Sequence, residues 1–238
     1  MNGLNWPSWA PMSNKRISGN KRVARRGPAK GYVTDQESFW AGEFGDVYST
    51  RNTGAQLIVS NLGLFAKILA RTENVCSVLE LGANIGLNLR AIQQFLPAAN
   101  LSAVEINRSA VAELKKLRGV RVHHQSLLEF KPDCRYDFVL IKGVLIHIHP
   151  EKLPQVYDLM HAASARYICL AEYYNPTPVA VPYRGHDDRL FKRDFAGEMI
   201  KRFPDLRLVD YGFVYHGDPN FAGDDFNWFL LEKDGSRR

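Results

Sequence analysis

The chain has 238 residues, of which 45% are hydrophobic, and its formal net charge is +6. This length suits one domain with a substantial core, and the alternation of helical and strand-like patches predicts an α/β fold. No apolar run reaches the roughly 18–20 residues of a membrane span, and the N-terminus lacks the apolar segment of a secretory signal, so we expect a cytoplasmic protein. Three widely spaced cysteines, Cys76, Cys134 and Cys169, predict reduced thiols instead of a disulfide or zinc framework.

The positive charge is concentrated in residues 1–34. This segment has seven basic residues and no acidic one, and without it the chain has 24 basic against 25 acidic residues. A domain that binds a polyanion should be basic across its working face, so the nearly neutral remainder disfavours nucleic acid as a partner. The segment mixes Asn, Ser, Gly, Pro and Arg without apolar periodicity, which predicts a flexible basic extension before a domain at 35–238.

Residues 35–72 are expected to cap this domain. The run from 39 to 48 is dense in aromatic residues, acids and glycine, and it follows neither a helical nor a strand period. Its aromatic side chains either fill gaps on the core or form a lid over a ligand, because tryptophan and tyrosine combine contact area with a polar group. A helix from about 53 to 70 follows, with an apolar stripe typical of a core-facing helix. The candidate substrate contacts of this segment are Trp40, Tyr48 and Arg51.

A glycine-bearing turn between a strand and a helix is the main motif of the central part of the chain. The apolar strand 78–81 contains Glu80 and leads into Gly82 and Gly86, and a helix is predicted over 87–95. Glycine tolerates positive φ and lets a ligand approach the backbone closely, so this turn suits a bound molecule that faces the first free N–H groups of the helix. An acid two residues before the first glycine would repel a pyrophosphate but suits a cationic ligand.

The pattern Glu80-x-Gly82-x-Asn84-x-Gly86 resembles motif I of the class I S-adenosylmethionine (SAM)-dependent methyltransferases, whose cofactor carries an ammonium and a sulfonium. A second short strand, 101–105, ends in Glu105, which lies 19 residues beyond Gly86. An acid at about this distance binds the ribose hydroxyls in dinucleotide folds, and the resemblance implies the same role here. The cofactor-binding residues predicted at the turn and this strand end are Glu80, Gly82, Ala83, Asn84, Gly86, Glu105 and Ile106.

The third predicted strand, 120–123, follows a predicted helix over 109–117. Many members of the family have an aspartate after this strand, where it contacts the adenine amino group. Here Gln125 or Ser126 takes that place, and either side chain can form a hydrogen bond with adenine.

The fourth strand, 136–141, is followed by two candidate catalytic histidines. The carboxyl ends of parallel strands face the ligand crevice, so Lys142 and Gly143 are expected beside the methyl group of the cofactor. His147 and His149 lie just beyond them and are the first candidates for a general base. A lone histidine is more often structural, but two at this position favour a catalytic role for at least one. No ligand spacing supports a metal site.

The fifth strand, 167–171, leads into a polar segment with further candidates. Glu172, Tyr173 and His186 stand behind the two histidines as possible bases. The loop 183–195 is rich in cations, and guanidinium groups bind carboxylate or phosphate bidentately. The alternative is a solvated loop whose cations pair with its aspartates. The predicted substrate contacts from this part of the chain are Tyr174, Tyr183, Arg184, Arg189 and Lys192.

Several longer stretches resemble the methylases found with pseudaminic acid (nonulosonic acid) biosynthesis genes. They are Phe39-Trp-x-Gly-Glu-Phe-Gly-Asp46, Leu140-Ile-Lys-Gly-Val-Leu-Ile-His147, Ala171-Glu-Tyr-Tyr-Asn-Pro-Thr-Pro178, Pro182-Tyr-Arg-Gly-His186, Leu190-Phe-Lys-Arg-Asp-Phe-Ala-Gly197 and Asp210-Tyr-Gly-Phe-Val-Tyr-His216. The resemblance covers roughly residues 35–232. It implies a SAM-dependent methyltransferase with a small, sugar-derived acceptor, either acidic or nucleotide-linked.

These inferences combine into one expectation for fold and function. Two strand-like runs, 206–213 and 226–232, would close the sheet as an antiparallel hairpin. The expected fold is therefore a Rossmann-like, seven-stranded class I methyltransferase sheet with helices on both faces. The expected reaction is an in-line displacement from sulfonium to an acceptor oxygen or nitrogen, accelerated mainly by alignment. Two alternatives stay open: an RNA or protein methyltransferase that docks its substrate through the basic extension, and a non-catalytic SAM-binding protein.

Overall fold

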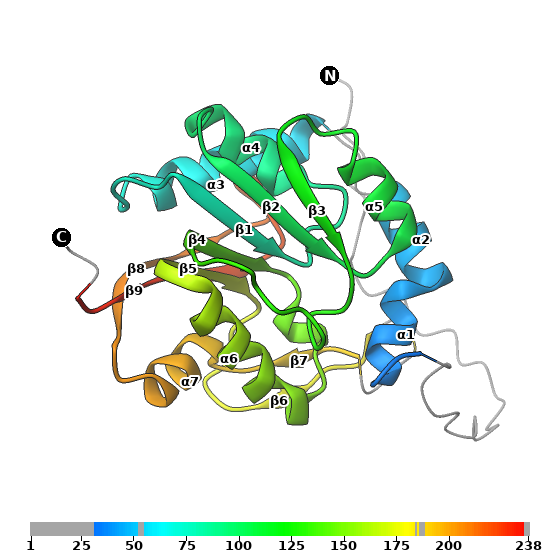
Figure 1. Ribbon diagram of the computed structural model, residues 1–238. Helices are drawn as coiled ribbons and strands as arrows, with labels where there is room; N and C mark the ends of the chain where they lie inside the picture. Colours follow the sequence, from blue (N-terminus) through cyan, green and yellow to red (C-terminus); the bar gives the residue numbers. More distant parts are fainter. Residues whose placement is uncertain (1–30, 52–54, 184, 186–188, 236–238) are drawn as a thin grey trace, which may run out of the picture.

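A seven-stranded sheet in the order β3-β2-β1-β4-β5-β9-β8 forms the centre of the protein (Figure 1). The computed structural model describes residues 31–51, 55–183, 185 and 189–235. The strands of the sheet are β1 (Ser77–Leu81), β2 (Asn100–Glu105), β3 (Val120–His124), β4 (Tyr136–Lys142), β5 (Ser164–Glu172), β8 (Leu206–Val214) and β9 (Phe226–Lys233). All seven strands predicted from the sequence are present.

The strand order creates a crevice at one end of the sheet. β1 to β5 are parallel, whereas β9 is antiparallel to both β5 and β8, as the predicted closing hairpin requires. The chain runs outward from β1 to β3 and then returns to β4 on the other side of β1. Ligands of open α/β sheets bind at the carboxyl ends of the strands where the order reverses in this way. The carboxyl ends of β1 and β4 therefore mark the expected ligand site.

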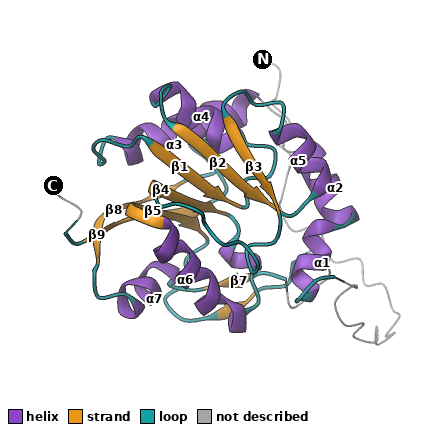
Figure 2. Cartoon of the chain, in the orientation of Figure 1, coloured by secondary structure: helices purple, strands orange, loops and turns teal. Residues whose placement is uncertain are grey.

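Helices cover both faces of the sheet and bury two apolar cores (Figures 1 and 2). α3 (Ala55–Leu69) and α4 (Leu87–Phe95) pack on one face, and α6 (Leu153–Ala163) and α7 (Phe195–Arg202) pack on the other. α5 (Arg108–Leu114) connects β2 to β3. In β4, the side chains of residues 138–141 alternate between the two cores and are fully buried, which explains the unbroken apolar run at these positions.

The segment before α3 differs from the expectation of an irregular run. It forms two helices, α1 (Asp35–Ala41) and α2 (Glu43–Arg51), which meet at Gly42. A capping box begins α1, because Thr34 Oγ1 accepts a hydrogen bond from the Glu37 N–H at 3.2 Å while Glu37 Oε2 accepts one from the Thr34 N–H at 2.8 Å. Figure 1 shows both helices on the side of the sheet towards which the arrowheads of β1, β2 and β3 point. α1 spans only seven residues, and α2 lacks an apolar stripe at helical spacing.

The polar segment after β5 also contains regular structure that the sequence did not predict. β6 (Val179–Ala180) pairs with β7 (Phe191–Lys192) as a short antiparallel hairpin. After β4, the chain makes two single 3₁₀ turns, η1 (Leu145–His147) and η2 (Pro150–Lys152), before α6 begins. The chain thus forms a 3₁₀ turn at Pro150 immediately before α6. No helix within the described ranges has the length and apolar character needed to cross a bilayer.

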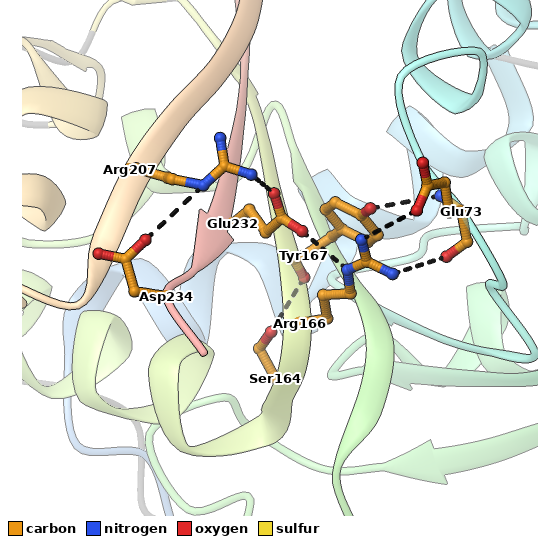
Figure 3. Close-up of polar contacts among 7 residues, drawn as sticks. All are labelled: Glu73, Ser164, Arg166, Tyr167, Arg207, Glu232 and Asp234. Atoms are coloured by element: carbon orange, nitrogen blue, oxygen red, sulfur yellow. Dashed lines mark hydrogen bonds and ion pairs between the residues drawn. The ribbon is translucent and has the colours of Figure 1, made fainter. Parts of the chain in front are cut away.

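Ion pairs around one buried carboxylate hold the opposite end of the sheet together (Figure 3). The Arg166 guanidinium lies between two carboxylates, with Nε 2.8 Å from Glu232 Oε1 and Nη2 3.5 Å from Glu73 Oε2. Arg207 pairs with the other oxygen of Glu232. The Glu232 side chain is only 3% exposed, whereas those of Glu73 and Arg207 reach solvent. The buried charges of Glu232 and Arg166 therefore both have opposite charges from within the chain.

Candidate active site

A cavity of about 300 Å³ lies at the carboxyl ends of the parallel strands. Its volume is at the lower end of the range for small-molecule sites. The predicted cofactor residues on its wall are Gly82, Ala83, Asn84, Glu105, Ile106, Gln125, Ser126, Lys142 and Gly143. The predicted catalytic and substrate residues on its wall are His147, His149, Glu172, Tyr173, Trp40, Tyr48 and Tyr183. The fold thus gathers segments that are far apart in the chain around one space.

Several predicted residues lie elsewhere. Glu80 and Gly86 are close in sequence to residues that line the cavity but do not line it themselves. Tyr174 is 40% exposed, with its ring 6.0 Å from that of Phe229. The cations Arg189 and Lys192 are also absent from the lining: the Arg189 guanidinium is 5.6 Å from the centre of the Phe39 ring, and Lys192 Nζ is 5.0 Å from that of Tyr173. Arg184, His186 and the side chain of Arg51 lie outside the described residues.

The two turn positions, Gly82 and Gly86, require glycine for different structural reasons. Both have left-handed φ, 75° at Gly82 and 80° at Gly86. A Cβ atom at Gly82 would lie 2.6 Å from a methyl carbon of Val144, on the wall of the cavity. A Cβ at Gly86 would lie 2.5 Å from Leu117 in the core. Gly82 therefore keeps the turn close to the cavity, whereas Gly86 allows α4 to begin against α5.

The Glu105 carboxylate lies where a ribose would be expected. It lines the cavity, and its two oxygens accept hydrogen bonds from the N–H groups of Asn84 at 2.8 Å and Asn107 at 2.7 Å. Burial raises the pKa of Glu105, and the backbone hydrogen bonds oppose that increase. Each carboxylate oxygen has a second lone pair, so the group can still accept hydrogen bonds from two neighbouring hydroxyls.

Glu80 does not line the cavity but is hydrogen-bonded to a residue that does. Oε1 accepts a hydrogen bond from Asn88 Nδ2 at 2.6 Å, and Asn88 itself lines the cavity. Oε2 is buried and has no hydrogen-bond partner among the described residues. Burial raises the pKa of Glu80 to about 8. Glu80 therefore keeps unused hydrogen-bonding capacity behind the glycine turn, and Asn88, which sequence reasoning missed, connects it to the cavity.

α1 and α2 are hydrogen-bonded to the loops after β1, β2 and β3, which carry most of the predicted cofactor residues. Ser126 Oγ donates to Glu37 Oε1 on α1. Asn107 Nδ2 donates to the Trp40 carbonyl at 3.2 Å and to Asp46 at 3.0 Å. On α2, Ser49 Oγ donates to Asn84 Oδ1 at 2.9 Å. These two helices thus have the position of a lid that contacts all three loops.

Sequence reasoning missed four residues of this arrangement, all of which line the cavity: Glu37, Ser49, Asn88 and Asn107. The Thr34-x-x-Glu37 pattern indicated only a helix start. Asn107 lies two residues beyond Glu105, and this closeness to a predicted cofactor residue was the signal that could have indicated a role for Asn107.

His147 has a fixed tautomer. Its Nδ1 lies 2.6 Å from the Arg189 carbonyl, which can only accept, so the proton is on Nδ1 and the lone pair is on Nε2. The ring centre lies 4.6 Å from that of Trp40 and 5.3 Å from that of Tyr183. Burial lowers the pKa of His147 to about 4, so the imidazole is neutral at pH 7. His149 instead accepts a hydrogen bond from the Glu151 N–H at 3.3 Å and caps η2.

Glu172 holds the turn on which His147 lies. Its Oε1 accepts hydrogen bonds from the Val144 and Leu145 N–H groups, both at 2.9 Å, and Oε2 is 3.5 Å from the Ile146 nitrogen. Burial raises the pKa of Glu172 to about 7 in spite of these bonds. Burial also raises the pKa of Tyr173, which makes its phenolate unfavourable. Glu172 therefore has a positioning geometry, and His147 keeps the free lone pair.

Comparisons with known proteins identify the class of fold. No family model matches the chain, and no curated protein matches it. The structure of the plantazolicin methyltransferase BpumL in complex with a pentazolic desmethylPZN analogue and SAH has a TM-score of 0.59 and 15% identity, covering 83% of this chain and 94% of that one. The structure of Burkholderia thailandensis 1,6-didemethyltoxoflavin-N1-methyltransferase with bound 1,6-didemethyltoxoflavin and S-adenosylhomocysteine has a TM-score of 0.61 and 17% identity, covering 83% of this chain and 86% of that one.

A third similar structure is magnesium protoporphyrin IX methyltransferase (ChlM) from Synechocystis PCC 6803 with bound SAH, with a TM-score of 0.59 and 12% identity over 83% of this chain and 98% of that one. At these identities the similarity establishes the fold alone. The Rossmann-like class I methyltransferase fold predicted from the sequence is confirmed.

Proposed function

We propose that the protein is a SAM-dependent methyltransferase that transfers a methyl group to an oxygen or nitrogen of a small acceptor. The observation that carries this proposal is the position of Glu105. Its carboxylate lies on the cavity wall at the end of β2, held by the N–H groups of two loops and with lone pairs remaining for two ribose hydroxyls. The solved structures of the same fold hold SAM or S-adenosylhomocysteine, which supports the same cofactor here.

The residues present fit this cofactor. SAM would supply an electrophilic methyl group on a positively charged sulfur. Glu105 would accept hydrogen bonds from the ribose, and Gln125 would form one with the adenine. The buried Glu172 carboxyl group lines the cavity and has no cationic partner at contact distance among the described residues, so it suits a ligand that brings positive charge. The turn at Gly82 leaves room for that ligand close to the backbone.

His147 is the base that the geometry favours for a hydroxyl acceptor. Its Nε2 lone pair is available, the Arg189 carbonyl fixes its orientation, and Glu172 holds the preceding turn. The pKa of about 4 keeps His147 unprotonated across the neutral range. In the proposed reaction, Nε2 takes the acceptor proton as the oxygen–carbon bond forms and the carbon–sulfur bond breaks. An amine acceptor in its neutral form would need no base.

We further propose that the acceptor is a small sugar derivative of the nonulosonic acid type. The support is the position of the stretches that resemble the methylases found with pseudaminic acid genes. Trp40, His147, Tyr173 and Tyr183 belong to four of these stretches, and all four line the cavity. Aromatic walls with polar edges suit a ring that carries several hydroxyls.

The test begins with calorimetric binding of SAM and S-adenosylhomocysteine to wild type, Glu105→Ala and Glu113→Ala. Micromolar binding that Glu105→Ala weakens at least tenfold is expected, because the ribose would lose its acceptor. Glu113 is an exposed acid paired with Lys116 on α5, so its substitution should leave binding unchanged. Absence of binding to folded wild type would remove the proposal.

The acceptor and the base are tested next. A screen of acidic and nucleotide-linked sugars for SAM turnover would identify the acceptor, with turnover of none of them contradicting the sugar assignment. For a hydroxyl acceptor, His147→Gln should lower kcat by about 10²–10⁴-fold, while His149→Gln should not. Protonation of His147 should not lower the wild-type rate between pH 6 and 8, since His147 titrates below that range, whereas Glu172, with a pKa of about 7, titrates within it. A fall in rate below pH 6.5 that Glu172→Gln also shows would point to another base.

A further inference from the structure

The Lys142 ammonium lies on the wall of the cavity and has no counter-ion at contact distance among the described residues. Lys142 is the last residue of β4, and its Nζ lies 5.0 Å from the centre of the Phe226 ring, which also lines the cavity. Within the described ranges, the ammonium makes neither a hydrogen bond nor an ion pair. Three acids, Glu80, Glu172 and Asp224, act on it only at longer range.

This isolation is unfavourable for a lysine in such a place. Burial lowers the pKa of Lys142, because an ammonium that has lost water without gaining a counter-ion is destabilised. Arg166, at the other end of the sheet, is partly buried too but has carboxylates at 2.8 and 3.5 Å. The chain thus pairs one cation internally and leaves the other facing the cavity.

Two of the three neighbouring acids, Glu172 and Glu80, do not exclude an anion from this position; the third, Asp224, also lines the cavity but makes no ion pair with Lys142 within the described ranges. The charge on Glu172 is spread over three backbone N–H groups, and a pKa of about 8 leaves Glu80 mostly protonated at pH 7. The other lysine on the cavity wall is Lys152, on the separate turn η2. The cations first expected to meet an anionic group, Arg189 and Lys192, do not line the cavity.

We propose that the Lys142 ammonium binds the carboxylate of a ligand held in this cavity. This inference rests on the methyltransferase function proposed above. The carboxylate has two possible sources, the methionine end of the cofactor and an acidic acceptor. Either would place a charge-assisted hydrogen bond at the end of β4, beside the expected site of methyl transfer.

The first arm of the test concerns the cofactor. SAM and decarboxylated SAM differ in that carboxylate alone, and their dissociation constants are measured on wild type, Lys142→Met and Lys152→Met. If Lys142 binds the cofactor carboxylate, wild type and Lys152→Met prefer SAM at least tenfold, and Lys142→Met binds the two compounds about equally.

The second arm concerns the acceptor. Proteins saturated with S-adenosylhomocysteine are titrated with N-acetylneuraminic acid and its methyl ester, and with benzoate and benzamide. If Lys142 binds an acceptor carboxylate, wild type prefers at least one acid over its neutral partner by tenfold or more. Lys142→Met then loses that preference while keeping its preference for SAM, and Lys152→Met keeps both.

The proposal is overturned if Lys142→Met changes neither preference, or if wild type discriminates in neither arm. Thermal unfolding checks the fold, and removal of an unpaired ammonium should leave Tm unchanged or higher. Lys142→Arg, which keeps the charge, should retain the preference that Lys142→Met loses. A folded wild type that binds neither SAM nor S-adenosylhomocysteine would instead refute the proposed function itself, so the two failures are distinguishable.

Discussion

Buried charged groups have different kinds of partner at the two ends of the central sheet. At the amino end of β5, Arg166 and Arg207 pair with the two oxygens of Glu232 (Figure 3). At the carboxyl ends of the strands, Glu80, Glu105 and Glu172 receive only backbone N–H groups and one side-chain amide.

This difference separates a structural cluster from a binding site. Ion pairs between buried groups satisfy their charges within the folded chain. Hydrogen bonds from neutral donors stabilise a carboxylate only in part, and so burial still raises the pKa values of Glu80 to about 8 and of Glu172 to about 7. The carboxyl end therefore keeps electrostatic capacity for a ligand, at a cost in stability.

The largest effect is expected from a substitution in the ion-pair cluster at the amino end of β5. Glu232→Gln leaves two arginines, one of them largely buried, without their shared carboxylate, and removal of one partner from a buried pair costs about 3–5 kcal/mol. Urea unfolding measures this loss, while SAM affinity below the unfolding transition should stay the same. Asp158→Asn is the control, because the Arg202–Asp158 pair is half exposed and should contribute under about 1 kcal/mol. Equal losses in the two variants would contradict the contrast between buried and exposed pairs.

A smaller effect is expected from Gly82→Ala at the binding end. The left-handed φ of 75° costs about 1–2 kcal/mol for a residue with a side chain. The new methyl group would also meet Val144 on the cavity wall, so SAM binding should weaken at least tenfold. Gly119→Ala is a matched control, since Gly119 has a φ of 78°, no contact below 3.7 Å and no place in the cavity lining. It should lose similar stability but no affinity, and a loss of affinity in both variants would assign the effect to strain alone.

The smallest expected effect concerns pH. The folded-state pKa of Glu80 is raised from 4.5 to about 8, so between these values the folded protein binds more protons than the unfolded chain, and stability falls as pH rises. The slope is at most about 1.4 kcal/mol per pH unit for this group. Glu172 adds to the fall below pH 7, whereas the lowered pKa of His147 acts in the opposite direction below pH 6.5.

Urea unfolding of wild type and Glu80→Gln between pH 6.5 and 8.5 tests this expectation. Glutamine resembles the protonated acid, so the variant should show a flatter dependence and exceed wild type most at the highest pH. Parallel curves would mean that Glu80 is already ionised at pH 6.5 in the folded protein. Glu113→Gln, at an exposed site, should follow the wild-type curve.

Local sequence patterns were sufficient for the sheet and the glycine turn. Strands such as 136–141 are apolar on both faces, and the predicted helix 87–95 coincides with α4. Patterns were insufficient for α1 and α2, because α1 spans only seven residues and α2, although as long as α4, lacks an apolar stripe at helical spacing. The hairpin of β6 and β7 has only two residues in each strand, which is below the length at which alternation can be recognised.

For the candidate site, the sequence by itself determined which chemical groups stand at the strand ends: the acids Glu80 and Glu105, the turn glycines, Lys142 and His147. Their order along the chain follows from local spacing, and the parallel strands bring them to one edge. Only the tertiary structure decided their partners. Glu172 caps the turn before His147, the Arg189 carbonyl sets the histidine tautomer, and Lys142 faces the cavity with no counter-ion at contact distance among the described residues. These contacts join residues far apart in the chain, and a hydrogen bond depends on distances and directions in space that no sequence spacing specifies.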